Sequence, residues 1–223
     1  MDIIEATQSR HTVREFKKTP VPEEIIRYVL EIALHAPSAQ NIQPWEVTVV
    51  SGKVLEDIKQ GVIEELYSPR RADHKHVHKA LENVFLQRQK DLAVRMYQLM
   101  GIAREDNERK AAWRRKGFCF YDAPAAILIA MDRSLLDYMP GLLSIGAFMQ
   151  NVCLAALNFG LGTCIQTEGV HFPLVIRKYI PIPETKELLI DIAIGYPDVD
   201  MPVNKLVPAR EPFENLVTWY DGK

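Results

Sequence analysis

The chain has 223 residues, of which 48% are hydrophobic and 25% are charged, and its formal net charge is −2. This ordinary globular composition excludes extensive disorder and a general positive field for nucleic acid. The N-terminus is acidic without a signal-peptide pattern, no uninterrupted apolar run reaches membrane-spanning length, and the three cysteines are widely spaced. We therefore expect a cytoplasmic protein with reduced, buried cysteines and neither a membrane nor a nucleic-acid partner.

The N-terminal part of the chain shows helical spacing of apolar residues and one β-branched run. Pro22, followed by Glu23 and Glu24, indicates the start of a helix, and Pro37 indicates its end. Helices are expected over residues 2–9, from 19–24 to Pro37, and from Gly52 to about Tyr67, and a strand is expected over 45–50.

Residues 68–117 are crowded with charged and amide side chains, interleaved with apolar residues. Two amphipathic helices joined near Gly101 account for this pattern, and they form an insertion between two strands. Some side chains here and just beyond could bind a substrate, although core packing is the ordinary role of the aromatic ones: Tyr97, Trp113, Arg114, Phe118 and Phe120. The histidines at 74, 76 and 78 lack a supporting ligand cluster, so we expect an exposed helix start and no metal site.

The C-terminal half returns to a core pattern. Its elements are a continuous apolar strand over 125–131, an almost wholly apolar helix over 141–159, a strand over 162–166, a helix over 173–179 and a strand over 187–194. The helix 141–159 lacks a polar face and must therefore be buried. Beyond Gly195 the chain is rich in proline and extended. Four strands without an uninterrupted βαβ series favour an α+β fold over a doubly wound sheet.

Two N-terminal segments carry side chains suited to binding. Arg10 and Arg14 stand four residues apart with the Thr12 hydroxyl between them, and guanidinium groups bind phosphate through paired hydrogen bonds. A solvated surface pair is the alternative. The loop 36–45 is bounded by prolines and carries four polar side chains between a helix and a strand, which suits a binding loop or ordinary turn chemistry.

Two later segments have the same double interpretation. Gln166–Gly169 follows a core strand, and Gly169 allows close approach of the backbone to a ligand; a simple connecting turn is the alternative. Arg210 lies in the extended tail, where a lone arginine is usually solvated.

Together, these segments resemble the FMN-dependent nitroreductase family. The residues that carry the resemblance are Arg10–Phe16, Ala36–Trp45, Gln150–Val152 leading to Leu161–Thr163, Gly195–Pro197 and Arg210. The resemblance implies an α+β fold with a central, mainly antiparallel sheet flanked by helices, in an interwoven homodimer with FMN at the subunit interface. It implies a single domain over 1–223, in which the insertion covers the active site and the tail is extended.

The resemblance also assigns residues to FMN. Arg10 and Arg14 would bind the phosphate together with Arg210, and His11 and Thr12 would contact the ribityl chain or the ring edge. Pro37, Ser38, Ala39 and Asn41 would come from the other subunit, and Gln166, Thr167, Glu168 and Gly169 would lie against the flavin. Members of this family often have serine where Thr12 stands, and threonine keeps the hydroxyl.

The function implied is an oxidoreductase in which NAD(P)H reduces FMN and the flavin then reduces a small electron-poor aromatic compound, such as a nitroaromatic, in alternating half-reactions. The flavin carries the chemistry, so we name no catalytic protein residue. Quinone or flavin reduction, reductive dehalogenation and flavin fragmentation are alternatives on the same scaffold. A flavin-binding module without turnover and a structural dimer are alternatives of another class. The sequence leaves open the choice between NADH and NADPH and the identity of the acceptor.

Overall fold

A computed structural model describes residues 1–68 and 80–221 of the chain. The helices are α1 (Ile3–Ser9), α2 (Glu23–Ala33), α3 (Gly52–Leu66), α4 (Asn83–Leu99), α5 (Asn107–Phe118), α6 (Met139–Leu157) and α7 (Pro173–Tyr179). The strands are β1 (Glu46–Ser51), β2 (Ala125–Asp132), β3 (Gly162–Gln166) and β4 (Lys186–Gly195). Short 3₁₀ helices, which the sequence did not indicate, are η1 (Ala39–Asn41), η2 (Phe120–Asp122), η3 (Arg133–Leu135), η4 (Glu168–Val170), η5 (Pro202–Lys205) and η6 (Phe213–Asn215).

The strands form an antiparallel sheet in the order β1-β2-β4-β3, which confirms the predicted α+β class. The apolar run of β2 is explained by its place inside this sheet, because alternate residues of a strand face opposite sides. Ala126 and Leu128 pack into one hydrophobic cluster, and Ile127 and Ile129 pack into another. Both faces of the strand are therefore buried.

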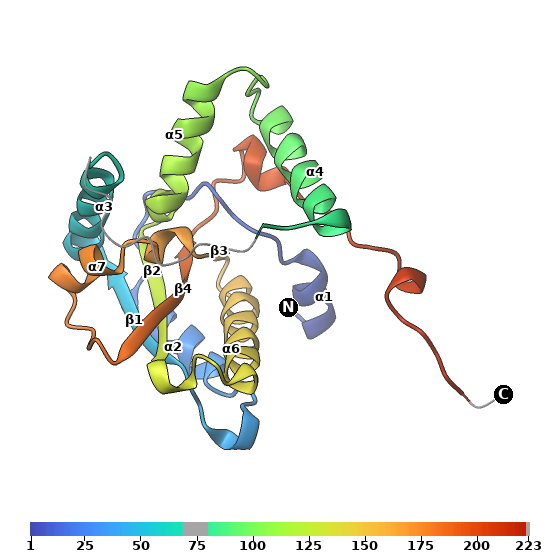
Figure 1. Cartoon of the computed structure of the whole chain (residues 1–223), viewed down its shortest axis with the longest axis horizontal. Helices are drawn as coiled ribbons and strands as arrows, with labels where there is room; N and C mark the ends of the chain where they lie inside the picture. Colours follow the sequence, from blue (N-terminus) through green and yellow to red (C-terminus); the bar gives the residue numbers. More distant parts are fainter. Residues whose placement is uncertain (69–79, 222–223) are drawn as a thin grey trace.

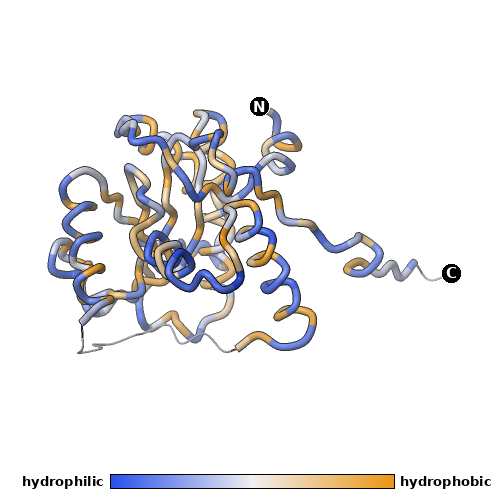
Figure 2. Tube along the Cα trace, turned by 90° about the horizontal axis from the view of Figure 1, so that it is seen from above, coloured by the Kyte–Doolittle hydropathy of each residue, from blue (hydrophilic) through white to orange (hydrophobic). Residues whose placement is uncertain are grey.

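Different helices cover the two faces of the sheet (Figure 1). One cluster joins the sheet to α3 and α7 through Ile58, Val62 and Ile176. The other joins it to α2 and α6 through Val29 and Phe148. Figure 2 shows hydrophobic stretches running through the middle of this body, whereas the C-terminal tail leaves it and mixes hydrophobic with hydrophilic residues.

The apolar helix α6 differs from its prediction in two ways. By length and composition it could cross a membrane, although Ser144, Gln150 and Asn151 divide it into apolar runs that are each too short to do so. It packs as a core helix instead, since Phe148 lies fully buried against the sheet. It is not buried all round, however, because Leu143 on its other side is 65% exposed.

Over its described residues from 80 onward, the insertion contains two helices joined near Gly101, as predicted, and Gly101 has a φ of +61° that favours glycine. The helices α4 and α5 pack on η5 through a small cluster of Ile102, Trp113 and Val203. Trp113 and Phe120 are buried, so both have the ordinary role of core packing. The histidines at 74, 76 and 78 lie outside the described residues.

Candidate functional site

The segment that holds Arg10 and Arg14 runs beside β3. Thr12 forms a parallel bridge with Thr163, and the Val13 N–H donates to the Thr163 carbonyl at 3.0 Å. This pairing depends on Gly162, because a Cβ atom there would lie only 2.4 Å from Val13 Cγ2. The arginine segment and Gln166, at the end of β3, are therefore held by the same strand.

Asn204 in η5 fixes the other side of this segment. Its Oδ1 accepts from the backbone N–H groups of Arg14 at 2.8 Å and Glu15 at 3.2 Å. Its Nδ2 donates to the carbonyls of Glu15 at 2.7 Å and Asp198 at 2.8 Å. An ion pair also connects the segment to the insertion, because Lys116 of α5 lies 2.5 Å from the Glu15 carboxylate.

Replacing Asn204 should therefore destabilise the protein. Asn204 is buried, so Asn204→Ala leaves several backbone groups of the segment unpaired, and the expected loss in the free energy of unfolding is about 2–4 kcal/mol. Urea denaturation measures this loss. The control Asn107→Ala, at an exposed asparagine at the start of α5, should change the free energy by less than about 0.5 kcal/mol. Equal effects of the two variants would contradict the role given to Asn204.

The two arginines are half-buried and interact with different neighbours. Arg14 hydrogen-bonds the phenol of Tyr121, whose pKa burial raises above its ordinary value. Arg10 lies close enough to Cys153 to lower the pKa of that thiol slightly, against a larger rise caused by burial. Burial likewise raises the pKa of Cys164 to about 12. These thiols are protonated at neutral pH and are not nucleophiles.

The segment Gln166–Gly169 begins at the last residue of β3 and continues beyond the strand. Gln166 and Gly169 are buried, Thr167 is half-buried and Glu168 is exposed. The Thr167 N–H donates to Glu168 Oε2 at 3.2 Å. A Cβ atom at position 169 would lie 2.3 Å from Phe120 Cε1, so packing against the protein itself already requires a glycine there.

The loop with Pro37, Ser38, Ala39 and Asn41 lies elsewhere. Its Ala39 N–H donates to Ser144 Oγ at 3.1 Å, near the start of α6, whereas β3 follows the end of that helix (Figure 1). The helix rises about 20 Å from Ser144 to Leu157. Within one chain, the structure therefore does not bring this loop to the arginine segment.

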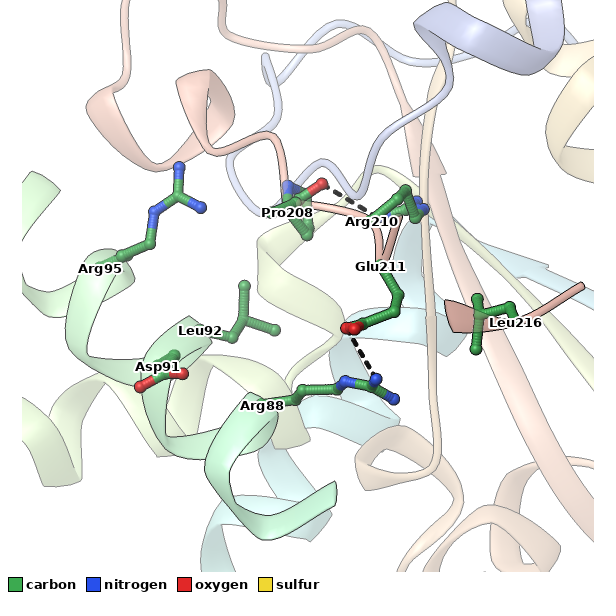
Figure 3. Close-up of a pocket in the computed structure, with 9 residues that line it drawn as sticks. Arg88, Asp91, Leu92, Arg95, Pro208, Arg210, Glu211 and Leu216 are labelled. Carbon is green, nitrogen blue, oxygen red and sulfur yellow. Dashed lines mark hydrogen bonds and ion pairs between the residues drawn. The ribbon is translucent and has the colours of Figure 1, made fainter. Parts of the chain in front are cut away.

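Arg210 lies exposed in the tail, beside a pocket of about 460 Å³ between the tail and α4 (Figure 3). Two further arginines line this pocket, Arg88 and Arg95, and Arg88 pairs with Glu211 at 2.8 Å. Leu92 lies between them on the same helix face, at the spacing that α-helix geometry requires. Neither Arg10 nor Arg14 is among the described residues that line it.

The sequence analysis missed four residues of this region. Arg88 and Arg95 could have been paired from their seven-residue spacing, which is two helical turns. Asp191 could have been noticed as the one charged residue within the apolar stretch 188–194 of β4. No signal in the sequence marks Asn204, because its partners are backbone groups of a distant segment.

The model of the nitroreductase family matches residues 7–196. The chain is 26% identical over 217 residues to a 4-nitrobenzoate reductase of Nocardioides sp. (strain LMS-CY), covering 95% of this chain and 87% of that protein. It is 29% identical over 198 residues to the nitroreductase NfnB of Mycolicibacterium smegmatis, covering 88% and 83% of the two chains.

Solved structures agree over nearly the whole chain. The FMN and NADPH-dependent nitroreductase NfnB of Sphigopyxis sp. strain HMH superposes with a TM-score of 0.92 at 25% identity, covering 99% of each chain. The FMN-dependent nitroreductase NfnB of Mycobacterium smegmatis, in complex with NADPH, superposes with a TM-score of 0.90 at 26% identity, covering 98% of this chain and 100% of that one. The family match covers most of the chain and includes both segments held by β3, and we conclude that the chain belongs to the nitroreductase family.

Proposed function

We propose that the protein is an FMN-dependent oxidoreductase that uses NAD(P)H to reduce nitroaromatic compounds. The observation that carries this proposal is the pairing of the Arg10–Arg14 segment with β3, which places two cationic side chains and the Gln166–Gly169 segment on one strand of a nitroreductase fold. Two relatives that match nearly the whole chain are named as enzymes that reduce nitro compounds. Their names support a nitroaromatic compound as the electron acceptor.

The residues at this strand suit FMN chemically. Arg10 and Arg14 offer guanidinium groups for the phosphate, with the Thr12 hydroxyl between them. The pocket beside Arg210 is lined by three arginines against two acids, Asp91 and Glu211, and its volume lies in the usual range of small-ligand pockets. We infer that Arg10, His11, Thr12, Arg14 and Arg210 hold the phosphate and ribityl end, while Gln166, Thr167, Glu168 and Gly169 lie against the ring.

Bound FMN would supply the two-electron chemistry between NAD(P)H and the acceptor. In the first reduction a nitro group, NAD(P)H and a proton yield a nitroso group, NAD(P)⁺ and water. The protein contributes binding and orientation, because the cysteines near the arginines are buried and protonated and are suited neither as nucleophiles nor as bases at neutral pH. We therefore assign no catalytic protein residue.

We infer a homodimer from three exposed apolar surfaces of the single chain. The first lies on α6 around Leu142 and Leu143, the second is formed by Ile3 and Ile4 of α1, and the third lies on the tail, where Tyr220 is 94% exposed. Contiguous exposed apolar surface marks an interaction site. A second copy would also supply Pro37, Ser38, Ala39 and Asn41, which lie too far from the arginines of their own chain.

Two further inferences complete this account. Residues 1–223 form one FMN-binding domain, with α4 and α5 as an insertion over the site and the residues after η5 as an extended tail. The protein works in the cytoplasm, in keeping with three free, buried cysteines.

Steady-state rates with three acceptors test the reaction class. Under NADH or NADPH, 4-nitrobenzoate should be reduced faster than a quinone or a halophenol at equal concentration. Faster turnover of the quinone or the halophenol would instead support quinone reduction or reductive dehalogenation. Bound FMN that neither nicotinamide reduces would identify a binding module without turnover.

A further inference from the structure

A fully buried carboxyl group lies behind the Gln166–Gly169 segment. Asp191, in the middle of β4, is 0% exposed and stands between Leu128 of β2 and Gln166 of β3 in the sheet. Its Oδ2 accepts a hydrogen bond from Gln166 Nε2 at 3.1 Å. Its Oδ1 is buried without a hydrogen-bond partner of normal geometry among the described residues. Burying a carboxyl oxygen without a hydrogen bond costs much free energy when the group is ionised, and far less when it is a neutral acid.

Asp191 contacts both ends of this segment. Gln166 Nε2 also donates to the Gly117 carbonyl at 2.9 Å, which links the carboxyl group to the insertion helix α5. At the other end, Gly169 packs directly on the acid, because a Cβ atom there would lie 2.6 Å from Asp191 Oδ1. Asp191 therefore supports both ends of Gln166–Gly169 from the protein interior.

The surroundings of the carboxyl group favour its neutral form. Burial, the largest effect, raises its pKa well above the ordinary value. The hydrogen bond from the Gln166 amide lowers the pKa, the negative charge of Glu168 raises it by less, and the backbone N–H groups of Gly169 and Asp191 have smaller lowering effects. The Cys164 thiol of β3 lies near the carboxyl group and is itself protonated. Arg14 lies near this thiol. Leu128 and Phe120 contribute only apolar atoms.

We propose that Asp191 is held as a neutral carboxylic acid and acts as a positioning residue, fixing the flavin-facing segment through Gln166 and Gly169. This role rests on the proposed function, since it assigns that segment to FMN. A neutral acid gives Gln166 an acceptor without placing a buried negative charge behind a ring that gains electrons during turnover.

The first test measures unfolding against pH in the protein without FMN, for the wild type, Asp191→Asn and Asp132→Asn. If folded Asp191 keeps its proton while the unfolded chain releases it, the unfolding constant of the wild type, divided by that of Asp191→Asn, should rise about tenfold per pH unit between about pH 5 and pH 7. Asp132, at the end of β2, is the matched control because hydrogen bonds from Ser134 lower its pKa to about 2. The corresponding ratio for Asp132→Asn should stay constant. A constant ratio for Asp191→Asn would overturn the neutral acid.

The second test measures FMN affinity by fluorescence quenching. Asp191→Asn keeps a neutral polar group of the same shape, so its dissociation constant should stay within about twofold of the wild type, whereas Asp191→Leu, which leaves Gln166 without this acceptor, should bind about tenfold more weakly. Equal affinities of all three proteins, or equal losses in both variants, would overturn the positioning role. A wild type that binds no FMN would refute the proposed function instead, and the pH ratio would still decide whether the acid is neutral.

Discussion

FMN should bind about tenfold to a hundredfold more weakly to Arg10→Ala and to Arg14→Ala than to the wild type. Each substitution removes a charge-assisted hydrogen-bond donor, which contributes about 1.5–3 kcal/mol to binding an anion. Arg14→Ala also removes the partner of the Tyr121 phenol, so it should lower stability more than Arg10→Ala. Fluorescence titration of the protein with FMN measures both affinities.

The control for charge is Arg27→Ala, which removes an arginine from an exposed pair with Glu23 on α2. Its FMN affinity should equal that of the wild type. Riboflavin, which lacks the phosphate, provides a second control because the arginine variants should bind it as the wild type does. An unchanged FMN affinity in Arg10→Ala and Arg14→Ala would remove the phosphate role from both residues.

A single methyl group at position 162 should disturb the site as strongly. In Gly162→Ala the new Cβ would lie 2.4 Å from Val13 Cγ2 and 2.9 Å from Val13 Cβ, both far too close. Valine cannot turn away freely because it is branched at Cβ. The segment must move off β3, so we expect a loss of about 1–3 kcal/mol in the free energy of unfolding and an FMN affinity at least about tenfold lower.

The double variant Val13→Ala/Gly162→Ala tests this cause. Shortening Val13 removes its two Cγ atoms, including the one at 2.4 Å, and leaves only the Cβ contact at 2.9 Å. The double variant should therefore bind FMN more tightly than Gly162→Ala alone. Comparison with Val13→Ala completes a double-mutant cycle, in which neighbouring residues show a coupling energy. Additive effects would show that the clash with Val13 is not the reason for the loss.

The pattern of hydrophobic residues predicted most of the fold. The strand Gly162–Gln166 and the helix Pro173–Tyr179 have the predicted bounds, and the continuous apolar run at 125–131 does lie in a strand covered on both faces. The ends of α6 are shifted by two residues, because its first turn starts at Met139 with Pro140 next to it. The 3₁₀ helices were missed because hydrophobic spacing cannot report such short elements.

The site was less predictable, because it depends on contacts between distant segments. A family resemblance indicated Arg10, Arg14 and Gln166. That β3 holds both of their segments follows from the close approach of Val13 to Gly162, which no local pattern predicts. Asn204 acts through backbone groups some 190 positions away in sequence. The loop around Ser38 contacts the start of α6, away from the arginine segment, and for this reason the proposed site takes the loop from a second copy of the chain.

The most direct test is a visible spectrum of the purified protein, titrated without air first with NADH and then with NADPH, followed by 4-nitrobenzoate. The account predicts yellow protein with a flavin spectrum, bleaching by one of the nicotinamides, and return of the colour when the nitro compound is added. Colourless protein that gains no flavin absorbance after incubation with FMN would contradict it.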